Sequence, residues 1–243
     1  MPTPPRSYGL DNVRSLMVLC ILLLHAACAY SFIVPWWHAL DSNHLFFDLL
    51  IICLDTFALP VLFFISGVFA APSHDRHGPK QFLIRKLKRL GLPIVILGSV
   101  LIPAMVYMGY LDRADEPLSF FKYWLAWMQS LGDWSFRLFI DMEGSAPFQD
   151  QFRPHHLWFL SLLLLFFLGY ALFRRIGVSF PSRRGFAHLL LVPFLAMVLS
   201  FAGVNMLIQD WGWFKFGPFI LLQPTRIPIY LIAFIMGRGP QTK

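Results

Sequence analysis

The feature that most constrains this chain is a series of apolar stretches, each long enough, or nearly so, to cross a lipid bilayer. A hydrocarbon core about 30 Å thick is crossed by roughly 20 helical residues. The apolar stretches cover residues 14–34, 46–70, 90–111, 157–173, 186–208 and 219–237. We therefore expect an all-α fold, a polytopic bundle of about six transmembrane helices, in which residues 1–243 form a single transmembrane domain.

The composition agrees with this class, because 57% of the residues are hydrophobic and only 14% are charged. The net charge of +7 comes largely from two basic segments between apolar stretches, 71–89 and 174–185. The segment 35–45 has no Lys or Arg, and 112–156 has seven acidic residues against four basic ones. Since basic loops stay in the cytoplasm, both termini are predicted there, and no nucleic-acid partner is expected.

The cysteines and the paired histidines give little sign of a disulfide or a metal site. Cys20, Cys28 and Cys53 all lie inside apolar stretches, where they are expected to be small buried apolar residues. His155 and His156 have no further ligand at a suitable spacing, so no metal is expected. No small-residue cleavage site follows the first apolar stretch, which is therefore predicted to be a retained helix and not a signal peptide.

The acidic segment 112–156 is expected to be an extracytoplasmic loop with structure of its own. Its part PLSFFKYWLAWMQSLGDW, residues 117–134, carries aromatic residues at nearly helical spacing. This pattern is typical of an amphipathic helix lying in the membrane interface. An ordered loop with a belt of aromatic side chains is the equal alternative.

Two ionisable residues of the first apolar stretch, Arg14 and His25, lie eleven positions apart. Eleven residues make nearly three helical turns, so both side chains point the same way and are separated by roughly 16 Å along the axis. With the amino terminus inside, Arg14 is expected near the cytoplasmic surface and His25 near mid-membrane. Alone, Arg14 is an ordinary arginine at a helix end, with Asp11 as a possible ion-pair partner. An imidazole inside the membrane is a candidate general base.

A second ionisable residue inside the membrane is Asp55. It lies about as far from the outer end of its predicted helix as His25 does from its own, so antiparallel helices would bring the two to similar depth. Asp55 could then orient the imidazole as part of an acid–base dyad. The alternative is that Asp55 bonds to a neighbouring backbone or hydroxyl group near Thr56.

Four segments, in order and at suitable spacing, resemble the membrane acyltransferase-3 family. They are LDNVRSLMVLCILLLH, LPVLFFISGVF, FLIRKLKRLGLP and HHLWFLSLLL. The stretch YSFIVPWWHAL is most similar to the glucan succinyltransferase branch, the glucans biosynthesis protein C type. The resemblance covers about residues 6–173, and weakly continues to YLIAFIMGR.

The sequence departs from the family pattern at two points. The family's basic Arg-x-x-Arg motif matches Lys86 to Arg89, with Arg85 directly before it. Lysine keeps the charge but loses the bidentate geometry of arginine, and Arg85 is the alternative for that role. The family usually has about ten spans, so this chain is expected to be a fragment or a shortened member.

The resemblance implies transfer of an acyl group, possibly succinyl, from cytoplasmic acyl-CoA to a hydroxyl of an extracytoplasmic glycan. The phosphates of the co-substrate would bind a basic cluster formed by Arg14, Arg85, Lys86, Lys88 and Arg89. His25 would take the proton from the acceptor hydroxyl, with Asp55 assisting. His156 and Trp158 would contact the acceptor or be structural. Ser66 would form a covalent intermediate or, beside Gly67, a close helix contact.

Two rival functions remain open at this point. A transporter or flippase subunit would use His25 and Asp55 as a proton relay, and an inactive fragment would lack part of its site. In the basic segment, the charges alone are also explained by membrane orientation. The expected location is the bacterial cytoplasmic membrane, with acyl-CoA, a carbohydrate acceptor and the lipid bilayer as partners and no bound cofactor.

Overall fold

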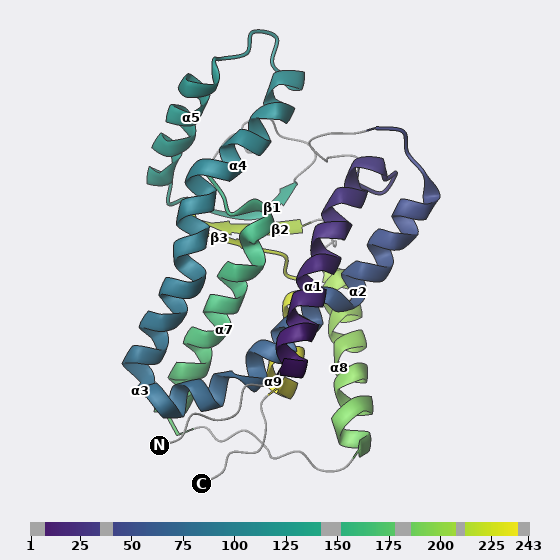
Figure 1. Ribbon diagram of the computed structural model, residues 1–243, viewed down its shortest axis with the longest axis vertical. Coiled ribbons are helices and arrows are strands. Elements are labelled where there is room, and N and C mark those ends of the chain that lie inside the picture. Colours follow the sequence, from purple (N-terminus) through teal and green to yellow (C-terminus); the bar gives the residue numbers. More distant parts are fainter. Residues whose placement is uncertain (1–7, 35–40, 142–151, 178–185, 208–211, 238–243) are drawn as a thin grey trace.

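A computed structural model describes residues 8–34, 41–141, 152–177, 186–207 and 212–237 of the chain. Most of these residues are helical, and Figure 1 shows a small sheet above the start of α7, with α4 and α5 extending past it. The helices are α1 (Tyr8–Ala27), α2 (Leu45–Val68), α3 (Ala70–Lys86), α4 (Leu92–Arg113), α5 (Phe120–Gln129), α7 (Trp158–Arg175), α8 (Phe186–Leu207) and α9 (Ile227–Gly237). The strands are β1 (Phe136–Asp141), β2 (Gly212–Phe216) and β3 (Ile220–Leu222).

The predicted count of six spans is not confirmed. Among the described residues, four helical segments are long and apolar enough to cross a membrane: Tyr8–Tyr30, Leu45–Val68, Ala70–Leu111 and His155–Arg175. They include α1, α2, α4 and α7, and they correspond to the first four predicted spans. In place of a sixth span over 219–237, the chain forms β3, a turn and the short helix α9. The chain is thus an integral membrane protein by its apolar helices, and α8 lies over the predicted fifth span, 186–208.

Helices α1 and α2 form an antiparallel pair joined by a tight cap. The buried carboxylate of Asp48 in α2 accepts hydrogen bonds from the Ser31 hydroxyl at 2.5 Å and from the Phe32 amide at 2.9 Å. These groups lie in the connection after α1, where the carboxylate gives the Phe32 amide the hydrogen-bond partner that a backbone N–H needs. The cap therefore fixes how α1 and α2 meet.

Two glycines bring α2 and α9 into backbone contact. A Cβ on Gly67 would lie 2.0 Å from the carbonyl oxygen of Phe234, and one on Gly237 would lie 1.9 Å from that of Phe64. No side chain fits at either position, so small residues permit this close approach, as expected for membrane helices. The predicted small-residue contact next to Ser66 therefore exists, and Gly67 makes it.

Helix α3 crosses the end of the bundle opposite the sheet (Figure 1). It bends at Gly78, whose φ of 72° is a conformation that L side chains rarely adopt. A five-residue π-helical turn, Leu87–Gly91, then joins α3 to α4. The basic segment predicted as a cytoplasmic loop is therefore helical.

Helix α5 lies within 117–134, the segment whose aromatic residues have nearly helical spacing, and its inner face packs on α4. Tyr123 and Trp127 are buried there, while Phe121 is exposed. The indole of Trp124 donates to the carbonyl of Ser99 at 2.8 Å. That carbonyl has no helical partner because the residue four positions later, Pro103, lacks an N–H.

A three-stranded antiparallel sheet, β1-β2-β3, is the main departure from the all-α prediction. Strand β1 comes from the predicted loop 112–156, β2 comes from the short connection between the predicted fifth and sixth spans, and β3 comes from the start of the predicted sixth span. Gly217, with a φ of 56°, lies in the turn between β2 and β3. The sheet covers the ends of the helices where α7 begins (Figure 1). Strands this short, in an apolar run, cannot be told from a helix by periodicity.

Candidate functional site

One cavity, of about 670 Å³, lies at the end of the bundle formed by the start of α1, the end of α2 and α3. We call it the basic cavity. Its charged and polar lining residues are Asp11, Arg14, Ser66, Ser73, Arg76, His77, Lys86 and Arg89. Four cations against one carboxylate make this a suitable site for a polyanion.

The structure separates the predicted donor-binding residues into two groups. Arg14, Lys86 and Arg89 line the basic cavity, whereas Arg85 is exposed and is not among its lining residues. Of the two alternatives for the basic motif, the Lys86–Arg89 spacing is therefore the one that faces the cavity. Arg76 also lines it, and it could have been found from sequence because it belongs to the same basic segment.

Aromatic rings position Lys86 in this cavity. Its ammonium lies 4.0 Å from the ring centroid of Phe167 and 5.4 Å from that of Phe82. Such cation–π contacts stabilise a charge in partly apolar surroundings. Ser66, which is buried, faces the same cavity and lies at its wall beside the α2–α9 contact.

A second cavity, of about 470 Å³, lies between the helices and the sheet. We call it the histidine cavity. Its polar lining residues are His25, Cys28, Asp55, His155, His156, Gln223 and Arg226, and most of the remaining lining is aliphatic or aromatic. A mostly apolar concave site with a few converging polar groups is typical of a small-molecule site.

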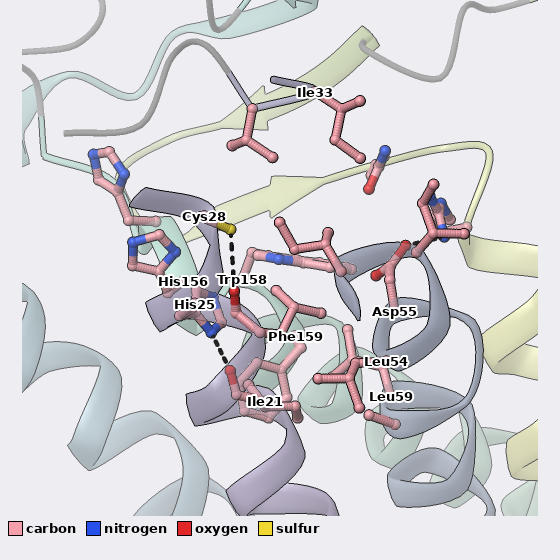
Figure 2. A pocket seen from close by; sticks show the side chains of 18 of the residues that line it. Ile21, His25, Cys28, Ile33, Leu54, Asp55, Leu59, His156, Trp158 and Phe159 are labelled. Atoms are coloured by element: carbon pink, nitrogen blue, oxygen red, sulfur yellow. Dashed lines mark hydrogen bonds and ion pairs between the residues drawn. The ribbon is translucent and has the colours of Figure 1, made fainter. Parts of the chain in front are cut away.

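His25 lies in the last turn of α1, closer to the helix end than the predicted mid-membrane position. Its Nδ1 is 2.7 Å from the carbonyl oxygen of Ile21, one turn earlier (Figure 2). A carbonyl only accepts, so Nδ1 carries the hydrogen and Nε2 carries the lone pair of the neutral ring. This tautomer has a basic nitrogen, which general-base catalysis requires.

His156 packs directly against His25. The two ring centroids are 4.7 Å apart and the ring planes lie at 74°. The neighbouring His155 is buried, and its Nε2 accepts from Nε of Arg153 at 2.9 Å. His155 has a φ of 41°, rare for a residue other than glycine, which places the two adjacent imidazoles on this wall of the cavity.

Asp55 lines the same cavity but lies across it from His25 (Figure 2). Its carboxylate binds the guanidinium of Arg226, with Oδ2 and Nη1 2.8 Å apart. The dyad hypothesis proposed that Asp55 orients the His25 ring. In the structure, the Ile21 carbonyl holds this ring instead. The hydroxyl of Thr56 bonds elsewhere, to the Ile52 carbonyl.

Arg226 is the functional candidate that sequence reasoning missed. It precedes α9 and lies within the predicted sixth span, 219–237, where a charged residue could have been flagged in the same way as Arg14. Its partner, Asp55, is 171 positions away, which no local pattern shows. Trp158, a predicted acceptor contact, also lines this cavity, beside Trp213 of β2.

No group of three metal-ligating side chains occurs among the residues that the structure describes. The three cysteines are free thiols, and Cys28 lines the histidine cavity. It is buried, as predicted, whereas Cys53 is exposed on the bundle surface.

A partly buried ion pair joins β2 to the segment before β1. Lys215 of β2, only 3% exposed, lies 3.5 Å from the carboxylate of Asp133. Hydrogen bonds from the Ser135 hydroxyl and amide hold the pKa of Asp133 below its usual range, and Lys215 adds to this. Burial lowers the pKa of Lys215, and the carboxylate opposes that shift.

Comparison with known proteins gives one result. A family model described as an acyltransferase domain, Acyl_transf_3, matches residues 7–242, which is almost the whole chain. Comparisons with curated proteins and with solved structures give no match.

Proposed function

The chain belongs to the acyltransferase-3 domain family, and from this premise we propose that it moves an acyl group from acyl-CoA in the basic cavity to an acceptor hydroxyl in the histidine cavity. The observation that carries the proposal is that α1 contributes to both sites. Arg14 lines the basic cavity and His25 lines the histidine cavity, eleven residues further along the same helix.

The basic cavity supplies the binding energy for the donor. Coenzyme A carries several phosphate charges, and guanidinium groups bind phosphate through charge-assisted hydrogen bonds. Arg14, Arg76 and Arg89 provide three guanidinium groups, and Lys86 adds an ammonium. The rise of the helix separates Arg14 from His25 by roughly 16 Å, a distance that the long thioester arm can span.

His25 carries the proton transfer. Its Nε2 takes the proton from the acceptor hydroxyl while the hydroxyl oxygen attacks the thioester carbonyl carbon. The tetrahedral intermediate expels the thiolate of coenzyme A, which takes the proton from the imidazolium. An ester and a free thiol result, and no covalent enzyme intermediate is needed. Ser66 lines the other cavity, so it belongs to the donor side.

The finer specificity rests on the sequence resemblance. We propose succinyl as the acyl group, a periplasmic glucan as the acceptor, both termini in the cytoplasm and the bacterial cytoplasmic membrane as the location. Part of the stretch that supports the glucan branch, residues 35–40, lies outside the described residues.

Transfer by the purified full chain in liposomes tests the proposal. Labelled acyl-CoA and a soluble oligoglucoside are supplied to the wild type and to His25→Ala. Loss of a general base lowers kcat by about 100-fold to 10,000-fold. The control is His44→Asn, at the exposed start of α2, which keeps wild-type turnover.

Two outcomes contradict the proposal. One is acyl transfer that is absent from the wild type or undiminished in His25→Ala. The other is movement of the labelled compound across the membrane without any acceptor, which identifies a transporter instead.

A further inference from the structure

The lining of the histidine cavity contains a wall of five residues that the mechanism above does not use. Trp158 begins α7, Trp213 belongs to β2, and Gln223 and Arg226 flank the turn between β3 and α9. Asp55 of α2 is the fifth residue. We call these five lining residues together the sheet-side wall. These five residues come from separate parts of the chain and meet only in the folded protein.

Two indole rings form the apolar part of the sheet-side wall. The centroids of Trp158 and Trp213 are 5.4 Å apart, and the ring planes lie at 84°. This edge-to-face contact fixes both planes. Both side chains are partly exposed and both line the cavity, so ring surface is available to a ligand.

An ion pair forms the polar part of the wall. Asp55 and Arg226 are 2.8 Å apart, and their side chains remain 35% and 22% exposed. A carboxylate only accepts hydrogen bonds and a guanidinium only donates them, so the pair offers both functions side by side. A sugar hydroxyl, which donates and accepts, matches such a pair.

The charge balance decides between a neutral and an anionic ligand. Arg226 is already neutralised by Asp55, and a second carboxylate here would be repelled by the first at close range. A neutral ring with hydroxyl groups meets no such repulsion, and its C–H faces can pack on an indole. The terminal carboxylate of an acyl group such as succinyl is therefore poorly suited to this wall.

We propose that the sheet-side wall is the carbohydrate-binding subsite for the acceptor. A neutral sugar ring packs on Trp213 and Trp158, its hydroxyls bond to Asp55, Arg226 and Gln223, and a further hydroxyl is presented to Nε2 of His25. This inference rests on the proposed function and deepens it. It makes Asp55 a substrate-binding residue, in place of an orienting partner for His25.

Binding and kinetics of the purified full chain test the subsite. The probe is a soluble neutral oligoglucoside, titrated by calorimetry without acyl-CoA, followed by its KM in the transfer assay. Trp213→Ala and Arg226→Gln each weaken oligoglucoside binding about tenfold or more and leave the KM of acyl-CoA unchanged. Trp213→Phe retains an aromatic face and keeps binding within about threefold of the wild type.

The matched control is Trp134→Ala, at the sheet end but outside the cavity lining and 61% exposed, which changes neither value. Should Trp213→Ala fail to fold, Gln223→Ala, with the same expected direction, takes its place.

Two results overturn the inference. If the variants raise the KM of acyl-CoA and spare oligoglucoside binding, the wall holds the acyl chain. If an anionic oligosaccharide binds and the neutral one does not, the charge argument is wrong. Failure of the proposed function is a separate result: the oligoglucoside then binds in a Trp213-dependent way, but no acyl group is transferred.

Discussion

The two cavities differ in how far apart in the sequence their residues lie. The cations of the basic cavity come from the start of α1 and from one segment between α2 and α4. The histidine cavity combines α1, α2, the start of α7 and the residues before it, two strands and the turn before α9. A site whose cations come mainly from one segment leaves a local sequence signature, whereas a site assembled from many elements leaves scattered residues whose meeting depends on the fold.

Helix α2 belongs to both cavities, so a change that moves it should affect both. In Gly67→Ala, the new methyl group would lie 2.0 Å from the Phe234 carbonyl oxygen, which forces α2 and α9 apart. We expect a loss of about 3 kcal/mol in the free energy of unfolding, with weaker binding at both cavities. Thermal unfolding in detergent measures it. Gly169→Ala, on α7 with open space around it, is the control and should be neutral or slightly stabilising. Equal behaviour of the two variants would show that the close contact is unimportant.

Two exposed arginines of the basic segment separate cavity lining from simple charge. Arg89 lines the basic cavity and Arg85 does not. Losing one charge-assisted contact to a phosphate should raise the KM of acyl-CoA about tenfold in Arg89→Gln, with kcat nearly unchanged. Arg85→Gln removes the same charge and should change KM less than about twofold. Similar effects in both variants would mean that the segment acts only through its overall charge.

Loss of the Asp133–Lys215 ion pair should lower the stability of the protein without affecting the basic cavity. Asp133→Asn leaves the buried ammonium of Lys215 without its carboxylate and should lower the free energy of unfolding by about 1 kcal/mol. Binding of acyl-CoA should not change, because the basic cavity lies at the other end of the bundle. Melting temperature and acyl-CoA titration together check both statements, and weaker donor binding would contradict the separation of the two ends.

The pH dependence of stability gives a second test of the Asp133 carboxylate. The folded protein holds the pKa of Asp133 below its usual value of about 4, so its ionisation stabilises the fold at pH values above that. This stabilisation is lost as the pH falls through the depressed pKa. The stability of Asp133→Asn should therefore depend less on pH between about 5 and 3 than that of the wild type. Parallel curves would show that the carboxylate contributes nothing to folding.

The membrane class, the first four apolar helices and the basic segment all follow from the amino-acid sequence alone. It also placed Arg14 and His25 on one helix face. These features depend on hydrophobic length and on helical periodicity, which act within one segment and need no neighbour. The amphipathic helix α5 was predictable for the same reason, since its aromatic spacing is local.

The residue pairs that form the histidine cavity, and the wall that they make, depend on the tertiary structure. The contact of Asp55 with Arg226 joins residues 171 positions apart, and β1 pairs with a strand that lies beyond α7 and α8. The start of the predicted sixth span is apolar enough for a helix, yet it pairs as β3 because β2 provides a neighbouring edge. Strand pairing and ion pairing lower the free energy only when the partner is present, so a single segment cannot record them.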